Sequence, residues 1–169
     1  MKTKNFRLSQ LPIELKLLTG SFVFVLSIGF LGGLLFVEST TSMEAQGVVE
    51  NYNGNEADSD AEEMKFKKSE HEMLNIIHTH LLSISLIFGI VGLLVFGTES
   101  PIWLKRVLMF EPLLSVLVTF GGIYLIWCGW NWMSWIVMLS GMAMTLSYIV
   151  SIILIFKTLI KKRSPISDS

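Results

Sequence analysis

The sequence predicts an all-α membrane protein, a bundle of four transmembrane helices with both termini in the cytoplasm. Of its 169 residues 51% are hydrophobic and 16% are charged, whereas a soluble domain carries about 25% charged residues. Four apolar runs reach the roughly 20 residues that cross a hydrocarbon core of about 30 Å. Positive charge gathers at one side of these runs. The predicted spans are Leu17–Val37, Met73–Phe96, Val107–Trp127 and Trp132–Phe156.

The first predicted span follows a short basic arm, residues 1–16, and is expected to be retained as a helix. It is longer than the apolar part of a typical signal peptide, and VESTTSMEAQG after it offers no clear small-x-small cleavage site. Gly29 and Gly33 form a GxxxG pair. Such a pair either allows another helix to approach closely or reflects the ordinary abundance of glycine in membrane helices.

Residues 38–70 are the only long polar segment and are expected to form an external loop. From Glu38 to Glu63 there are eight acidic residues and no basic residue. The stretch NYNGNEADSDAEE has almost nothing apolar to bury, so it is expected to be mobile, while GVVENY is compatible with a short strand. The residue spacing of a calcium-binding loop is absent. A solvated acidic loop is therefore favoured over a calcium site.

The remaining turns and the basic residues predict the orientation. Gly97 and Pro101 suit a turn between the second and third spans, and CGWNW separates the third from the fourth. The arm, the 97–106 turn and the C-terminal end from Lys157 onward carry ten of the thirteen Lys and Arg residues. The positive-inside rule therefore predicts a cytoplasmic arm (1–16), a membrane domain (17–157) and a cytoplasmic tail (158–169).

Ionisable side chains are costly inside a span and mark candidate sites. All three histidines, His71, His78 and His80, lie at the outer start of the second span. The helical period places His71, Asn75 and His78 on one face, whereas His80 lies about 200° around the helix from His78. Both His78 and His80 therefore cannot face one point from a straight helix.

Three alternatives follow for this cluster. Imidazole is a standard axial ligand of haem iron, so the first is haem b at His78 or His80, with the second ligand from Met138, Met142 or another protomer. The second is a metal such as copper, which imidazole and thioether ligands suit. The third is no cofactor, with the histidines hydrogen-bonded at the interface. A lone cysteine, Cys128, excludes covalent attachment of a c-type haem through CxxCH.

The second candidate site is Glu111, which precedes Pro112 in the third span, roughly one to two helical turns from the cytoplasmic surface. It would relay protons with Ser147, Ser151 or Tyr148, or it would reach Lys105 or Arg106 at the interface. Two polar or small stripes are expected to face the interior of the bundle. They are Glu111, Ser115, Thr119 and Gly122 in the third span, and Ser134, Met138, Gly141, Thr145 and Tyr148 in the fourth.

The string His78-Thr79-His80-Leu81-Leu82 resembles the haem-ligand turn in the large subunits of haem–copper oxidases and nitric oxide reductases. It is also similar to small four-helix membrane proteins that share HTHLL. In the oxidase pattern a later helix supplies a second histidine, which this chain lacks, so oxygen reduction is not implied. Residues 17–130, with ENYNGNE and MKFKKSEHEMLNIIHTHLLSISLIF, resemble bacterial inner-membrane proteins that accompany respiratory cytochromes.

These observations give three expected functions. The first is a small inner-membrane protein of a bacterial respiratory system that binds haem b at His78 or His80. The second is a cofactor-free structural or assembly subunit, in a homo-oligomer or with other membrane subunits. The third is a proton-coupled carrier that uses Glu111. The sequence does not decide whether the protein is an enzyme. A net charge of −1 gives no reason to expect nucleic acid as a partner.

Overall fold

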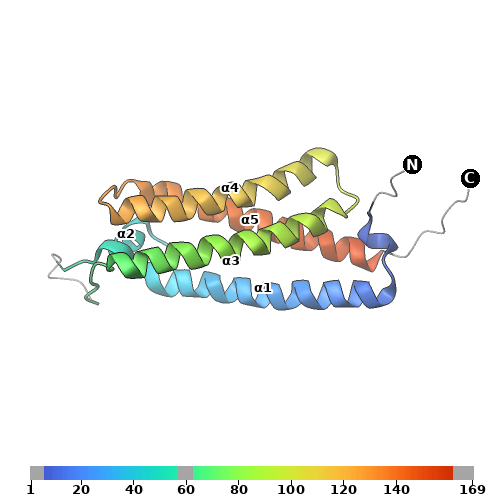
Figure 1. Cartoon of the computed structure of the whole chain (residues 1–169), viewed down its shortest axis with the longest axis horizontal. Coiled ribbons are helices and arrows are strands. Elements are labelled where there is room, and N and C mark those ends of the chain that lie inside the picture. The colour runs from blue at the N-terminus through green and yellow to red at the C-terminus, as the bar shows by residue number, and fades with distance from the viewer. Residues whose placement is uncertain (1–5, 57–62, 162–169) are drawn as a thin grey trace, which may run out of the picture.

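The structure is a computed structural model and is described over residues 6–56 and 63–161. Four long helices run the length of the molecule (Figure 1), and each is long and apolar enough to cross a membrane. The all-α, four-span fold class is thus confirmed. The elements are η1 (Leu8–Gln10), α1 (Ile13–Thr41), α2 (Ala45–Asn53), α3 (Glu70–Phe96), α4 (Ile102–Trp127) and α5 (Met133–Ile160).

Each long helix extends beyond the apolar run that predicts it at one end or at both, and three of the four begin next to a proline or a serine. Pro12 and Pro101 stand just before α1 and α4, where the fixed φ of proline suits a helix start. Ser69 begins α3 in a capping box: its Oγ accepts from the backbone N–H of Glu72, and the Glu72 carboxylate accepts from the backbone N–H of Ser69.

The expected short strand in GVVENY is wrong, because this segment forms α2. Val48 is buried, and Val49 and Tyr52 pack against the core. This spacing places all three on one helical face. The adjacent valines favour a strand only where a partner strand exists, and the described residues contain none beyond an isolated antiparallel bridge from Gly54 to Phe66. The segment is therefore stabilised as a helix, with one face buried, rather than as a strand.

The chain reverses sharply between α1 and α2. Ser42 and Met43 both have positive φ, 51° and 52°, and the turn brings Gly47 against the end of α1. A Cβ at Gly47 would lie 2.0 Å from the carbonyl oxygen of Thr41. The predicted external loop is thus structured at both of its ends. Residues 57–62 of the expected mobile stretch lie outside the described residues, as do residues 1–5 and the tail from 162.

The core is built around α4, which packs along both α3 and α5. Val116 and Ile126 of α4 are fully buried. The approach to α5 is close at Gly122, where an added Cβ would lie 2.6 Å from a methyl of Val137.

Helix α1 is attached to this core at fewer points. Tyr148 of α5 forms the main junction: its ring stacks on Phe30 of α1 with centroids 4.0 Å apart and receives the edge of Phe88 of α3. Its hydroxyl lies 3.3 Å from Ser27 Oγ. Apart from the adjacent backbone of α1 itself, no atom of the described chain lies within 4 Å of a Cβ added at Gly29 or Gly33. The GxxxG pair is therefore not used in packing the described chain.

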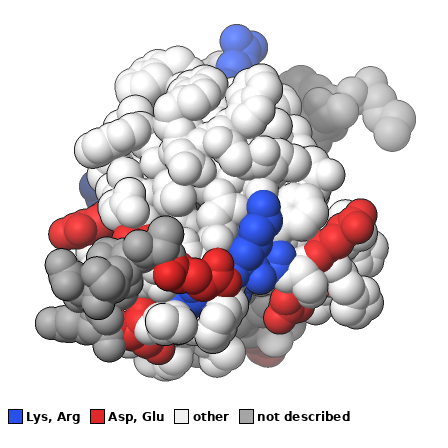
Figure 2. Space-filling view, turned by 90° about the vertical axis from the view of Figure 1, so that its left-hand side faces the viewer, with Lys and Arg blue, Asp and Glu red and all other residues white. Residues whose placement is uncertain are grey.

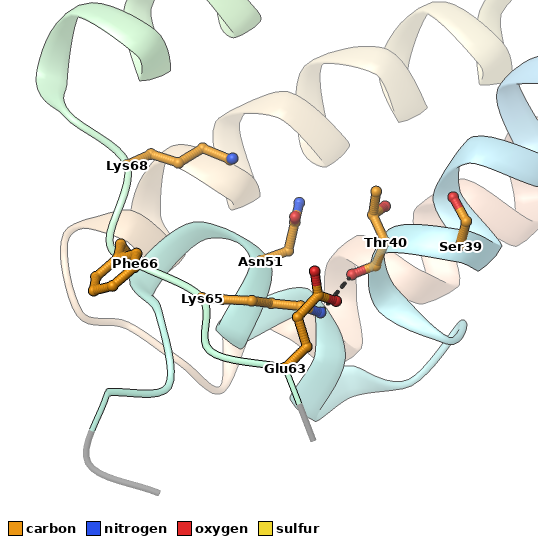
Figure 3. A pocket seen from close by; sticks show the side chains of 7 residues that line it. All are labelled: Ser39, Thr40, Asn51, Glu63, Lys65, Phe66 and Lys68. Atoms are coloured by element: carbon orange, nitrogen blue, oxygen red, sulfur yellow. Dashed lines mark hydrogen bonds between the residues drawn. The ribbon is translucent and has the colours of Figure 1, made fainter. Parts of the chain in front are cut away.

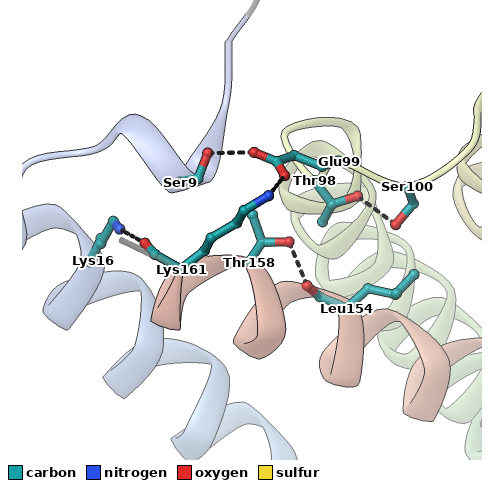
Figure 4. Close-up of polar contacts among 8 residues, drawn as sticks. All are labelled: Ser9, Lys16, Thr98, Glu99, Ser100, Leu154, Thr158 and Lys161. Atoms are coloured by element: carbon teal, nitrogen blue, oxygen red, sulfur yellow. Dashed lines mark hydrogen bonds and ion pairs between the residues drawn. The ribbon is translucent and has the colours of Figure 1, made fainter. Parts of the chain in front are cut away.

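Both ends of the described chain lie at one end of the bundle (Figure 1), here called the terminal end. The opposite end, with α2 and residues 128–132, is the loop end. At the terminal end Glu99 forms an ion pair with Lys161 and accepts from Ser9 Oγ at 2.9 Å. Lys16 Nζ donates to the carbonyl of Lys161 at 2.8 Å (Figure 4). That this end faces the cytoplasm stays a prediction of the charge pattern.

The approach of α2 to α1 gives a first prediction. Gly47→Ala would place a methyl group against the Thr41 carbonyl, and overpacking of this kind costs about 1–3 kcal/mol. Thermal unfolding of the full chain in detergent should show a lower midpoint than wild type. Gly89→Ala is the matched control, since nothing lies within 4 Å of its added Cβ. Equal midpoints for Gly47→Ala and wild type would contradict the close approach.

The Glu99 contacts give a second prediction. The hydrogen bond from Lys161, followed by that from Ser9, holds the pKa of Glu99 below its ordinary value. A depressed carboxyl pKa contributes stability at neutral pH that is lost as the pH falls through the folded-state pKa. Wild type should therefore melt above Glu99→Gln at pH 7, and the two melting temperatures should converge as the pH falls through the depressed pKa of Glu99. Exposed Glu14 at the same end supplies the control Glu14→Gln, and a difference independent of pH would refute this account.

Candidate functional site

The segment between α2 and α3 is fastened to the loop end by its lysines. Lys65 Nζ donates to the carbonyl of Thr40 at 2.9 Å, and Lys67 Nζ donates to that of Trp127 at 2.9 Å. Trp127 Nε1 donates in return to the carbonyl of Lys68 at 2.7 Å. Cations thus meet the carbonyl ends of α1 and α4, where a helix dipole favours positive charge. Figure 2 shows basic side chains between acidic ones on this end.

A shallow, open pocket lies beside this segment (Figure 3). The Lys65 ammonium and the Glu63 carboxylate extend across it, and Phe66 stands at its edge. Because Lys65 already bonds to Thr40, the pocket mainly reflects how the segment is anchored. It is lined by Ser39, Thr40, Asn51, Glu63, Lys65, Phe66 and Lys68, and none of the predicted site residues is among them.

The three histidines are exposed on α3, but they differ in their contacts. His80 Nδ1 lies 2.7 Å from the carbonyl oxygen of Ile76, and its ring stacks on Phe120 of α4 with centroids 5.1 Å apart. A carbonyl only accepts, so Nδ1 carries the hydrogen and Nε2 keeps its lone pair. A histidine that binds a metal through Nε2 is held in the same way.

The other members of the predicted histidine cluster are less constrained. His71, Asn75 and His78 are exposed, and their side chains make no hydrogen bond within the described residues. The methionines lie on α5, where Met138 is half-buried against the core and Met142 is 57% exposed. The hydrogen bond and ring stacking of His80 go to Ile76 and Phe120, so neither methionine is brought to it by these contacts.

Glu111 lies in a different environment, at the interface of α4 and α5. Its Oε1 accepts from Ser115 Oγ at 2.5 Å, and its Oε2 accepts from Ser147 Oγ. Of the expected partners, Ser147 is therefore bonded to the carboxyl. Tyr148 instead faces Ser27 of α1, and Lys105 donates to the carbonyl of Phe96 at 3.0 Å.

The polar interface continues beyond Glu111. Ser140 Oγ donates to the carbonyl of Ser115 and lies 2.9 Å from Thr119 Oγ1. The α4 stripe is as expected, with Ser115, Thr119 and Gly122 buried. The expected α5 stripe faces the interior only in part. Ser134 and Tyr148 are buried, but Thr145 bonds to the carbonyl of Gly141 on its own helix, and the residues that cross to α4 are Ser140 and Ser147.

Sequence reasoning missed Ser140 and the anchoring lysines. A serine in a membrane helix can bond to a carbonyl one turn back, so its presence alone does not predict a partner on another helix. Within the described ranges, no three His, Cys, Asp or Glu residues gather as a metal-binding group. The two candidate sites are therefore a single oriented imidazole and a single hydroxyl-bonded carboxyl.

A family model that describes a transmembrane helical domain, Aq_1264_TM, matches residues 42–166. The matched region begins directly after α1 and includes α2 to α5. No curated protein and no solved structure matches the chain. Since the match covers most of the chain and agrees with four apolar membrane-length helices, the protein belongs to the Aq_1264_TM family of transmembrane helical domains.

Proposed function

We propose that the protein is a membrane subunit of a bacterial respiratory system and holds b-type haem through Nε2 of His80. The observation that supports this best is the bond between His80 Nδ1 and the Ile76 carbonyl. It fixes the tautomer that leaves Nε2 available, and the Phe120 ring supports the imidazole from one side. A haem ligand requires this combination of orientation and a free lone pair.

The same reasoning separates His80 from His78. The two residues are two positions apart and project about 200° away from each other on a helix. Only His80 has its second ring nitrogen bonded and its ring stacked within the described residues. The proposal therefore assigns the ligand to His80 and gives His78 no role in coordination.

The second axial ligand is proposed to come from another subunit or a second copy of the chain. No histidine follows His80 in the sequence, so two histidines from different helices of one chain cannot hold the iron. His80 is itself exposed, which leaves its Nε2 side open to a neighbour. When bound, haem would supply one-electron transfer, and the chain would supply the orientation of the imidazole and an apolar surround.

This proposal gives a third prediction. The full-length protein, purified in mild detergent with its associated subunits, should show a Soret absorption band. His80→Ala should remove most of that band, because the oriented nitrogen is lost, while His78→Ala on the opposite face should retain it. Absorption spectra at equal protein concentration make the comparison. Equal spectra for the two variants, or wild type without a Soret band, would overturn the assignment.

A cofactor-free subunit of a larger membrane assembly is the second candidate, and α1 favours it. This helix lies outside the family match, joins the core through Val23, Ser27 and Phe30, and leaves the face around Gly29 and Gly33 uncovered. Glycines on a membrane helix allow a neighbouring helix to approach closely. Under this alternative, α1 joins the family domain to a neighbouring membrane subunit.

A fourth prediction tests this alternative. The double substitution Gly29→Leu with Gly33→Leu places both new Cβ atoms in open space, so the monomer is expected to fold and melt as wild type. An assembled complex should instead lose this protein, as measured by the mass of the detergent-solubilised particle. Gly121→Leu, an equally open position on α4, should leave the mass unchanged. A particle of unaltered mass in the double variant would exclude an interface at these glycines.

A further inference from the structure

Glu111 is the only acidic or basic residue in the apolar part of the membrane domain. No other Asp, Glu, Lys or Arg occurs within Leu17–Val37, Leu81–Phe96, Val107–Trp127 or Met133–Phe156. A carboxyl at such a position is energetically costly in a bilayer, so it marks a candidate functional site.

Within residues 6–56 and 63–161, the side-chain contacts of Glu111 are serine hydroxyls, and no Lys or Arg forms an ion pair with it. Ser115 Oγ and Ser147 Oγ each occupy one carboxyl oxygen. The salt bridge found in the described part of the chain joins Glu99 and Lys161. The backbone is also altered here: Pro112 has no N–H, so the Leu108 carbonyl lacks its usual helical donor. Two serine hydroxyls, rather than a basic side chain, therefore contact the Glu111 carboxyl among the described residues.

These hydroxyls belong to a longer series along the α4–α5 interface. On one side, Ser140 bonds to the Ser115 carbonyl and contacts Thr119. On the other side, Ser151 Oγ donates to the Ser147 carbonyl at 2.7 Å. A hydroxyl both donates and accepts, so Ser115 and Ser147 are able to bond to the carboxyl in its ionised and in its protonated form.

The other titratable groups of the neighbouring helices do not pair with Glu111. On α5 they are Tyr148, which is 3.3 Å from Ser27, and exposed Lys157. On α4 they are Lys105, bonded to Phe96, with exposed Arg106 at the terminal end and Tyr124 near the loop end. On α3 no titratable residue occurs between Leu81 and Phe96.

From this arrangement we infer that Glu111 is a proton-binding site inside the membrane, with Ser147 and Ser115 holding its two carboxyl oxygens. On release, the carboxyl O–H bond breaks, the proton passes to water, and the serine beside that oxygen turns from accepting to donating a hydrogen bond. On uptake the same bonds are remade in reverse. No electron is transferred, and the site is separate from the proposed haem ligand on α3, so either assignment can fail without the other.

Labelling with dicyclohexylcarbodiimide tests the inference, because this apolar reagent reacts with protonated carboxyls in membranes. Full-length protein in lipid nanodiscs should be labelled at Glu111, as located by peptide mass spectrometry. Labelling should decrease as the pH rises, and Glu111→Gln should abolish it. Absence of labelling at every pH, labelling independent of pH, or protection by sodium ions would overturn proton binding at this residue.

Infrared difference spectra between acid and alkaline pH supply a readout that needs no reagent to enter the bundle. A protonated-carboxyl C=O band should appear at acid pH and disappear in Glu111→Gln. Ser147→Ala should shift the pH at which the band appears, since one carboxyl oxygen loses its donor. Ser83→Ala is the matched control, because Ser83 bonds only to Thr79 of its own helix. A band that survives in Glu111→Gln would assign the proton elsewhere.

Discussion

The interface between α4 and α5 carries the constraint on which the rest of the fold depends. In lipid, polar groups must find their partners inside the protein, and this interface satisfies them with hydroxyls. Ser115 and Ser147 bond to Glu111, and Ser140 bonds to the Ser115 carbonyl. Close approach at Gly122 makes these bonds possible. With α4 and α5 joined in this way, α3 packs on the other side of α4.

The other elements are attached to this core by different kinds of contact. Helix α2 and the lysine segment close the loop end by bonding to the carbonyl ends of α1 and α4, and Glu99 with Lys161 closes the terminal end. Along its length α1 depends mainly on aromatic contacts at Tyr148. The family match includes α2 to α5 and begins after α1. Both observations describe a three-span core to which a further span is added.

The two candidate sites illustrate different ways in which a membrane helix presents a polar group. His80 is satisfied on its own helix through one nitrogen and leaves the other toward the surface of the bundle. Glu111 is bonded to Ser115 on its own helix and to Ser147 on α5, so that each carboxyl oxygen has a hydroxyl partner. The first arrangement suits a ligand from outside the chain, and the second suits a proton exchanged within it.

By itself the sequence determined the four spans, the turns between them and the positions that are costly in lipid, because length, hydropathy and single ionisable residues are local properties. Only the tertiary structure decided that GVVENY is helical, that Ser140 and Ser147 cross to α4, and that His80 differs from His78. Such hydroxyls have a ready alternative on their own helix, as Thr145 shows. Whether a hydroxyl bonds to its own helix or to a neighbouring one depends on how closely the neighbouring helix approaches. That distance cannot be read from a local sequence pattern.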